Sequence, residues 1–346
     1  PCGKDAWGGL AEARRSGLVS GGRLQGRVLG RLKGRLLTIG MMVHCVIVGA
    51  SRSGKGAGHV VPSEIGWGES AFTYDRKGEL WHITADYRRT LSHTFYFAPT
   101  DPNTARWNPL FEVRKGAMEI ADIQNIVGIL VDPIGLKGGN LDFFDQSAAN
   151  FFTGVILHCL YAEPDEHKTL GHVRRLLIDI EATLDAMLAT KHRWRPDAAA
   201  SDGLARDGDG QPIAETHPEV WLGATAFRSM EPRVRSSVLA TAQKSLALWA
   251  DPLVCHATGA SDFCIGDLVC SKAPVSLYLI TPQAHADRLA FIVRVMLRQS
   301  LNSLMETVDT DSRGRPKRHK LLMMLDEFPK LCLLYTSDAA DEGLGV

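Results

Sequence analysis

The residues best suited to chemistry stand in one short glycine-rich segment. Gly49, Gly54 and Lys55 have the spacing of a phosphate-binding loop. In such a loop, consecutive backbone N–H groups surround an anion and a lysine ammonium neutralises the outer phosphates of a nucleotide. The candidate nucleotide-binding residues are Gly49, Ala50, Ser51, Arg52, Ser53, Gly54, Lys55, Gly56 and Ala57.

One position of this loop departs from the usual pattern. A serine or threonine normally follows the lysine and gives its hydroxyl to Mg²⁺, but here Gly56 follows and has no side chain. The spacing still favours a nucleotide site with one metal ligand missing. The alternative is a glycine-rich turn with an incidental lysine.

A second candidate group lies about 270 positions further along the chain. Asp326 and Glu327 directly follow the apolar run 321–325, as in a Walker B strand. Asp326 would hold Mg²⁺ directly or through water, and Glu327 would orient and deprotonate an attacking water molecule. The alternative is an acidic strand end that caps a turn. The phosphate loop elsewhere in the chain favours the catalytic interpretation, with Lys55 and Glu327 as catalytic residues.

The elements around both motifs predict an α/β fold. Residues 43–48 are apolar and β-branched, which predicts a buried core strand leading into the loop, and a helix broken by Pro62 is expected over 58–67. Further strands are expected over 70–74, 94–97, 275–280 and 321–325, with helices over 82–90 and from 286 to about 308. Strands that alternate with helices indicate a parallel sheet covered on both faces. Charged residues 75–79 follow one strand, where open α/β sheets bind ligands.

Between these parts, the spacing of apolar residues becomes helical. From 118 to about 249 the pattern indicates an all-helical insert. Its aromatic stripe from Phe143 to Phe152 is interpreted as core. Residues 195–218 are rich in Asp, Gly, Ala and Pro, which predicts a flexible loop.

Composition limits the function classes. The chain has 346 residues with 45% hydrophobic content, enough for one large core or two smaller ones. Lys+Arg and Asp+Glu number 39 each, so overall charge indicates no nucleic acid or membrane partner. Residues 1–40 are locally basic, and we interpret them as a solvated edge hairpin, with a surface near membrane or DNA as the alternative.

The cysteines and the apolar runs add two expectations. The seven cysteines form no C-x-x-C pair, and no H-E-x-x-H motif is present. This favours reduced, buried thiols in a cytoplasmic protein over a disulfide or zinc framework. No apolar run reaches the roughly 18 residues of a membrane helix. The chain begins at Pro1, which suggests a fragment whose membrane anchor lies outside it.

Taken together, the motifs resemble the TraG/TraD-type coupling proteins of conjugation and type IV secretion. The residues that carry this resemblance are those of 49–58, 75–79, 106–110, 250–252, 276–279 and 326–328. The likeness runs in the right order from the first residues to Leu331. Members of the family often carry glycine at the position of Gly56, which would leave Mg²⁺ to phosphates, water and Asp326.

The resemblance implies a fold, an activity and partners. The fold would be a RecA-like P-loop NTPase domain interrupted by an all-α domain. The activity would be ATP hydrolysis with Mg²⁺, in a homo-hexameric ring on the cytoplasmic side of the bacterial inner membrane. The ring would recruit relaxase-bound single-stranded DNA, held without sequence preference, or effector proteins, and pass them to type IV secretion channel components.

This reading sets the expected domain limits. Residues 1–117 and 257–331 would form the nucleotide-binding domain, and 118–256 the all-α insert. The family's N-terminal membrane helices and its last strands have no counterpart here, so the fragment by itself is expected to be soluble, and whether it turns over ATP stays open. Residues 332–346 look like translated adaptor sequence and are excluded from the functional interpretation.

Two other functions fit the sequence. The first is a substrate-docking module in which nucleotide acts as a conformational ligand, and it predicts partner binding by residues 118–256 without ATP. The second is a DNA translocase outside secretion. The residues 75–79 and 106–110 that match the coupling proteins argue against the second.

Overall fold

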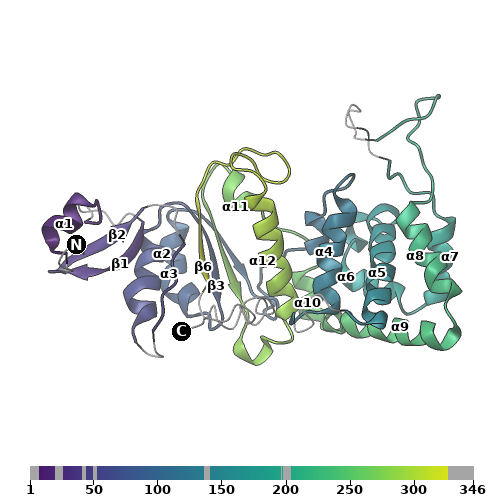
Figure 1. The fold of residues 1–346 in the computed structure, drawn as a ribbon, viewed down its shortest axis with the longest axis horizontal. Helices are drawn as coiled ribbons and strands as arrows, with labels where there is room; N and C mark the ends of the chain where they lie inside the picture. The colour runs from purple at the N-terminus through teal and green to yellow at the C-terminus, as the bar shows by residue number, and fades with distance from the viewer. Residues whose placement is uncertain are drawn as a thin grey trace, which may run out of the picture.

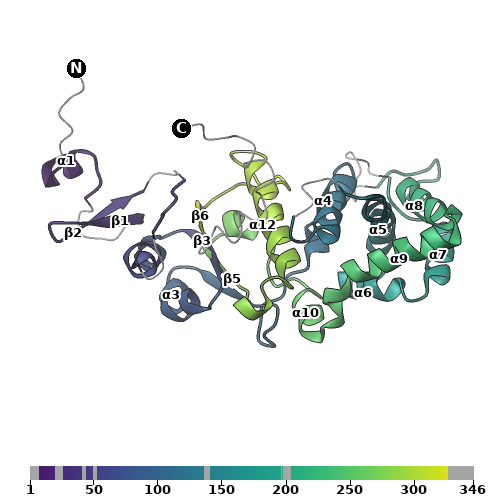
Figure 2. The ribbon, with the colours of Figure 1, turned by 60° about the horizontal axis from the view of Figure 1, so that its bottom comes forward.

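The computed structural model describes residues 8–19, 26–40, 44–49, 53–135, 141–195, 197 and 204–325. The described chain is elongated, with a hairpin at one end, a sheet in the middle and a group of helices at the other end (Figure 1). A second view, turned about the horizontal axis, shows the same order of parts (Figure 2). The predicted α/β fold class is confirmed by this sheet and its flanking helices.

The central sheet has four parallel strands in the order β4-β5-β3-β6. Its strands are β3 (Ser70–Asp75), β4 (His93–Phe97), β5 (Val275–Ile280) and β6 (Leu321–Leu325), which agrees with the four apolar runs 70–74, 94–97, 275–280 and 321–325. Every residue of β3 and β5 is buried. That burial fits two inner strands of a parallel sheet covered on both faces.

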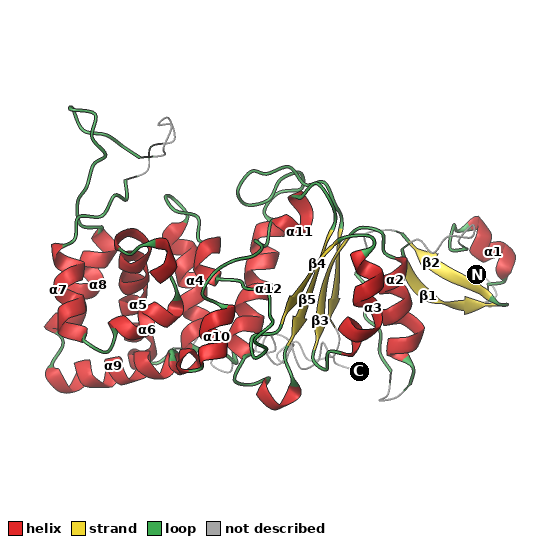
Figure 3. Cartoon of the chain, turned by 180° about the vertical axis from the view of Figure 1, so that it is seen from behind, coloured by secondary structure: helices red, strands yellow, loops and turns green. Residues whose placement is uncertain are grey.

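Helices cover both faces of the sheet (Figure 3). On one face lie η1 (Gly56–Val60), a π-helical turn that runs directly into α2 (Val61–Gly66), and α3 (Glu79–Arg89). On the other lie α11 (Asp267–Cys270) and α12 (Ala290–Met305). Successive side chains of β5 point to opposite faces of the sheet. Leu277 belongs to the large apolar core on one face, and Tyr278 belongs to the cluster that packs against α3 on the other.

Every element named in the described residues between β4 and β5 is a helix. Its longer helices surround α5 (Phe143–Ala162), which contacts α4 (Glu119–Val131), α8 (Pro218–Ser229) and α9 (Pro232–Ser245). The remaining elements are η2 (Pro109–Glu112), η3 (Asp165–His167), α6 (Leu170–Leu176), α7 (Ile180–Ala189), η4 (Ala247–Ala250) and α10 (Pro252–Ala257), with η5 (Gln283–His285) after β5. One buried apolar cluster runs from the sheet into these helices. The limits 118 and 256 of a separate domain therefore stay a prediction.

The N-terminal basic segment forms the expected hairpin. After α1 (Leu10–Arg15), strands β1 (Arg27–Leu32) and β2 (Arg35–Ile39) pair antiparallel around a turn at Lys33 and Gly34. The hairpin joins the rest of the chain through α2, because Ser63 Oγ accepts a hydrogen bond from the Val28 amide at 2.9 Å.

The strand predicted over 43–48 is wrong for its described part. Residues 44–49 form no strand, and Val46 and Val48 are 79% and 89% exposed. A strand needs a partner strand beside it to form backbone hydrogen bonds. The four-stranded sheet does not include residues 44–49, and the hairpin that precedes them contacts η1 and α2.

Three smaller expectations concern the aromatic stripe, the loop over 195–218 and the cysteines. In the aromatic stripe, Phe151 and Phe152 are buried as predicted, but Phe143 and Phe144 are exposed at the first turn of α5. The loop expected over 195–218 holds no helix before α8 in its described residues, only isolated bridges. Among the described cysteines, Cys159 is buried but Cys45 is exposed, and all five of them are free thiols.

Candidate functional site: the glycine-rich loop and the carboxyl edge of the sheet

The described part of the glycine-rich loop closes on itself through its lysine. Lys55 Nζ donates a hydrogen bond to the carbonyl oxygen of Gly49 at 2.6 Å. Gly54 has φ +84°, in the left-handed region that glycine adopts without steric cost. Gly49, Ser53, Gly54, Lys55, Gly56 and Ala57 lie within the described residues, whereas Ala50, Ser51 and Arg52 lie outside them.

The packing of the loop fits a phosphate cradle. A Cβ added to Gly49 would lie 2.7 Å from Ser53 Oγ and 3.4 Å from Lys55 Cδ, so a larger residue at this position would require the Ser53 side chain to move. Gly56 differs, because no heavy atom lies within 4 Å of the position of its Cβ. A tight turn followed by a helix start is the geometry in which backbone N–H groups bind phosphate.

The helix that follows the loop runs antiparallel to β3. Only residues 67–69 connect α2 to β3, so the start of η1 lies towards the carboxyl end of the strand. In open parallel sheets this is the edge where ligands bind. This chain path directs the start of η1, next to Lys55, towards the same edge of the sheet as the charged segment after β3.

The neighbouring strand β6 ends at the same edge. Its last residue, Leu325, pairs with Tyr74 of β3 in the parallel register. Asp326 and Glu327 are the next two residues and lie outside the described part of the chain. Their predicted roles as metal ligand and base therefore stay predictions.

Asp75 at the end of β3 has a structural role. Its carboxylate accepts backbone hydrogen bonds from Lys77 at 3.2 Å, Gly78 at 2.9 Å and Trp81 at 3.0 Å. Gly78 supports this turn with φ +74°. The carboxylate thereby caps the start of α3, and the sequence 75–79 positions the helix beside the site.

A buried polar network that the sequence analysis missed fixes α2 against the sheet. Glu64 is fully buried, its Oε1 accepts from Thr73 Oγ1 at 2.5 Å, and burial raises the pKa of its carboxyl. Arg88, also fully buried, donates to Ser276 Oγ at 3.0 Å and to the backbone carbonyls of Glu64, Trp67 and Glu69. The sequence held one signal for this network. Glu64 and Arg88 are charged residues on helix faces that are otherwise apolar, and buried charges need polar partners.

The segment 106–110 joins the sheet to the helices. Asn108 is fully buried, and its Nδ2 donates to the carbonyl oxygen of Lys168 at 2.8 Å. Arg106 pairs with Asp262 at 2.7 Å. In 250–252, Asp251 caps α10 and accepts from Arg288 at 2.7 Å. These motif residues hold the parts of the fold together.

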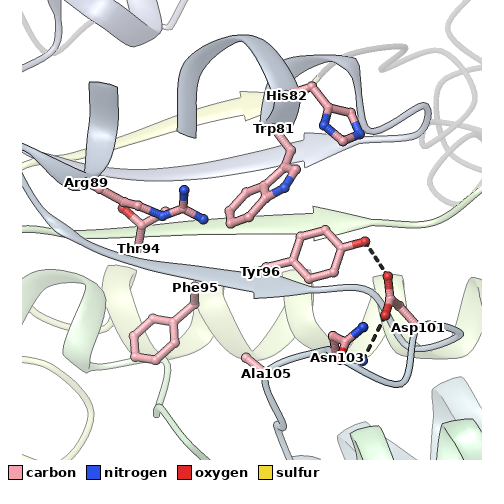
Figure 4. Close-up of a pocket in the computed structure, with 9 residues that line it drawn as sticks. All are labelled: Trp81, His82, Arg89, Thr94, Phe95, Tyr96, Asp101, Asn103 and Ala105. Carbon is pink, nitrogen blue, oxygen red and sulfur yellow. Dashed lines mark hydrogen bonds between the residues drawn. The ribbon is translucent and has the colours of Figure 1, made fainter. Parts of the chain in front are cut away.

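A pocket of about 540 Å³ opens beside β4, an edge strand of the sheet (Figure 4). The Trp81 ring lies 4.7 Å from the Tyr96 ring and 5.3 Å from the Tyr278 ring, between centroids, and Arg89 lies over it at 4.8 Å. Tyr96 donates to Asp101 at 2.9 Å, and burial raises the pKa of the phenol to about 12. Because Trp81 already packs on three side chains, we assign this pocket to packing of α3.

Comparison with known proteins defines the family. The family described as Type IV secretory system Conjugative DNA transfer matches residues 10–340. This chain belongs to that family. The resemblance to TraG/TraD-type coupling proteins expected from the sequence is confirmed, and the curated relatives are TraG and VirD4 coupling proteins. The matched region ends inside 332–346, which lies outside the described residues.

The curated relatives are coupling proteins about twice as long as the region they share with this chain. A conjugal transfer protein TraG of Escherichia coli is 37% identical over 317 residues, covering 88% of this chain and 47% of its own length. Protein VirD4 of Agrobacterium fabrum is 28% identical over 345 residues, covering 96% of this chain and 47% of its own length. The chain spans about half the length of the curated relatives it matches.

A solved coupling protein supports the fold. The plasmid coupling protein TrwB, determined in complex with the ATP analogue ADPNP, aligns with a TM-score of 0.51 and 16% identity over 85% of this chain and 59% of TrwB. The likeness confirms the RecA-like fold class. No helix in the described ranges is both long and apolar enough to cross a membrane.

Proposed function

We propose that this chain is the nucleotide-binding core of an ATPase coupling protein. In this role it recruits relaxase-bound single-stranded DNA or effector proteins and drives them into a type IV secretion channel. The observation that carries the proposal is the glycine-built loop closed by Lys55 and Gly49, which leads into η1 and α2 at the carboxyl edge of a parallel sheet. Membership of a conjugative DNA-transfer family supplies the biological context.

The roles at the site follow from charge and position. The loop 49–57 binds the phosphates, and Lys55 neutralises the outer ones. Asp326 would hold Mg²⁺, which offsets phosphate charge when bound. Glu327 would take the proton of the attacking water. Binding of ADPNP by TrwB, a protein of similar fold, supports nucleotide binding.

The assembly and its setting belong to the same proposal. A homo-hexameric ring at the cytoplasmic side of the inner membrane, anchored by sequence outside this chain, would act on backbone phosphates without base preference. Secretion-channel components would be its partners in the membrane.

The test compares hydrolysis with binding in a protein extended to the length of its relatives. Glu327→Gln should keep ATP affinity and lower turnover at least about 100-fold, since it removes a general base. Glu181→Gln, an exposed residue of α7, is the matched control and should keep full turnover. Normal hydrolysis by Glu327→Gln would overturn the assigned base. A wild-type protein that binds ATP without hydrolysing it would indicate the docking module instead.

A further inference from the structure

Three side chains of types that can bind a metal lie close together where α5 leads into α6, away from the predicted nucleotide site. Glu163 follows the last residue of α5, His167 ends η3, and His172 lies in the first turn of α6. One atom from each, all within 4.8 Å of one another, can serve as ligands to one metal ion. We call this set the Glu163 cluster.

The distances within the Glu163 cluster are close to those of a metal site. Glu163 Oε1 lies 3.4 Å from His172 Nε2, and Glu163 Oε2 lies 3.7 Å from His167 Nδ1. The two imidazole rings stack 4.8 Å apart, between centroids. Tetrahedral ligation by nitrogen and oxygen at about 2.0–2.1 Å needs ligand atoms about 3.4 Å apart. A small movement of His167, whose side chain is 46% exposed, is enough to reach this geometry.

One ligand atom is buried without a hydrogen bond. Among the described residues, His172 Nε2 is shielded from solvent and makes no hydrogen bond of good geometry, its nearest acceptor being Glu163 Oε1 at 3.4 Å. Buried polar atoms in proteins are normally satisfied. A metal ion bound between His172 and Glu163 would use this nitrogen.

The ligand chemistry indicates the kind of ion. Two imidazoles and one carboxylate suit zinc, with water in the fourth position, whereas Mg²⁺ prefers oxygen ligands. We infer that Glu163, His167 and His172 bind one zinc ion, or a divalent transition metal of similar preference. This inference is independent of the proposed nucleotide site.

A neighbouring arginine gives the site a specific signature. Arg175 Nη2 lies 3.1 Å from His172 Nδ1. Because a guanidinium can only donate, His172 Nδ1 is the acceptor of this hydrogen bond and carries no proton. A neutral histidine that binds metal through Nε2 carries its proton on Nδ1. The exposed Arg175 side chain therefore swings away when metal binds, and its contact competes with the metal.

Metal at the Glu163 cluster would stabilise the connection between α5 and α6, which contacts segment 106–110 next to the sheet. It would link the end of α5 to the start of α6 across a short loop. Lys168 in this loop accepts the hydrogen bond from Asn108, and Cys159 of α5 donates to the carbonyl oxygen of His167 at 3.5 Å. Binding that favours the folded state raises thermal stability, so zinc should raise the melting temperature.

The experiment uses the untagged full chain, stripped of metal with a chelator. Co²⁺ is titrated and followed by visible absorption, and Zn²⁺ is then added. We expect one equivalent of Co²⁺ to give the intense bands of tetrahedral cobalt, Zn²⁺ to remove them, and excess Mg²⁺ to leave them unchanged. No bands, or displacement by Mg²⁺, would overturn the proposal.

Variants separate this site from adventitious binding. His167→Ala, at a side chain exposed enough to spare the fold, should weaken Co²⁺ binding at least about tenfold, and so should His172→Gln. His285→Ala, an exposed histidine of η5, is the matched control and should keep wild-type affinity. Arg175→Ala should bind as tightly or more tightly. Unchanged affinity in His167→Ala, or loss of binding in Arg175→Ala, would contradict the assigned ligands.

Discussion

The Lys55 ammonium donates a hydrogen bond to the Gly49 carbonyl oxygen, 2.6 Å away across the glycine-rich loop. The contact joins the two ends of the predicted phosphate-binding segment. It places a positive charge beside Gly49, where an added side chain would crowd the Ser53 hydroxyl. Because this contact holds Lys55 beside Gly49, it lowers the ordering cost of anion binding.

The two glycines on either side of Lys55 should respond differently to substitution. Gly54→Ala places a side chain at φ +84°, which costs roughly 1–2 kcal/mol, and it should also weaken ATP binding. Gly56→Ser is the matched control. Its Cβ has open space, so stability, ATP binding and any ATPase activity should be retained. Chemical denaturation and nucleotide titration measure both, and loss of turnover in a folded Gly56→Ser protein would contradict this account of the loop.

Removing the cap at the end of β3 should destabilise α3. Asp75→Ala leaves the amides of Lys77, Gly78 and Trp81 without their acceptor, at a cost of at least about 2 kcal/mol in free energy of unfolding. Asp75→Asn keeps one acceptor oxygen and should cost less. Asp86→Ala, at a side chain that is 94% exposed, serves as the control. Equal stability of Asp75→Ala and wild type would show that the capping bonds are not important.

The buried arginine should be among the most sensitive positions of the sheet. Arg88→Met leaves backbone carbonyls of α2 and the adjoining loop without their hydrogen-bond donor. It also removes the positive charge near the buried Glu64 carboxyl. We expect a loss of about 3–5 kcal/mol. Arg88→Lys should recover only part of this, because an ammonium cannot reach acceptors on several sides. Urea denaturation of both variants tests this, and a loss below about 1 kcal/mol in Arg88→Met would contradict it.

Stability should fall as the pH falls below neutrality because of a buried histidine pair. The His217 amide donates to His192 Nδ1 at 3.2 Å, so His192 Nε2 carries the proton and donates to His158 Nδ1 at 3.0 Å. Burial, with the neighbouring His158 and His217, lowers the pKa of His192 to about 4, and burial also lowers that of His158.

The direction of this pH effect follows from proton uptake. Between about pH 6.5 and 4 the unfolded chain binds protons that the folded chain does not. Stability is therefore complete above pH 6.5 and falls below it, by up to about 1.4 kcal/mol per pH unit for each histidine. His192→Asn should flatten the dependence of unfolding free energy on pH. An unchanged dependence of unfolding free energy on pH in this variant would contradict the role assigned to His192.

Most of the sheet could be predicted because its strands are apolar over their whole length. Residues 70–74 and 275–280 are buried on both faces in the structure. The similar run 43–48 shows the limit of this signal, since a short apolar segment does not reveal whether a partner strand is within reach. Residues 44–49 lie outside the four-stranded sheet and pair with none of its strands.

The site was predictable to the extent that it depends on local spacing. The Gly49–Lys55 closure follows from a short pattern, whereas the roles of Asp326 and Glu327, outside the described residues, stay predictions. The Glu64–Arg88 network and the Glu163 cluster depend on contacts formed only when separate elements fold together. The sequence places Asp75 at a strand end, where ligands often bind. The structure shows that its carboxylate instead accepts hydrogen bonds from backbone amides.

The most direct test of the central claim is a titration of the purified chain with a fluorescent ATP analogue and Mg²⁺. We predict saturable binding that unlabelled ATP displaces. Lys55→Ala should weaken the affinity at least about tenfold, or about 1.4 kcal/mol, while Lys244→Ala, at an exposed lysine of α9, should leave it unchanged. A folded wild-type chain that binds no nucleotide, or a Lys55→Ala variant with wild-type affinity, would contradict the proposed function.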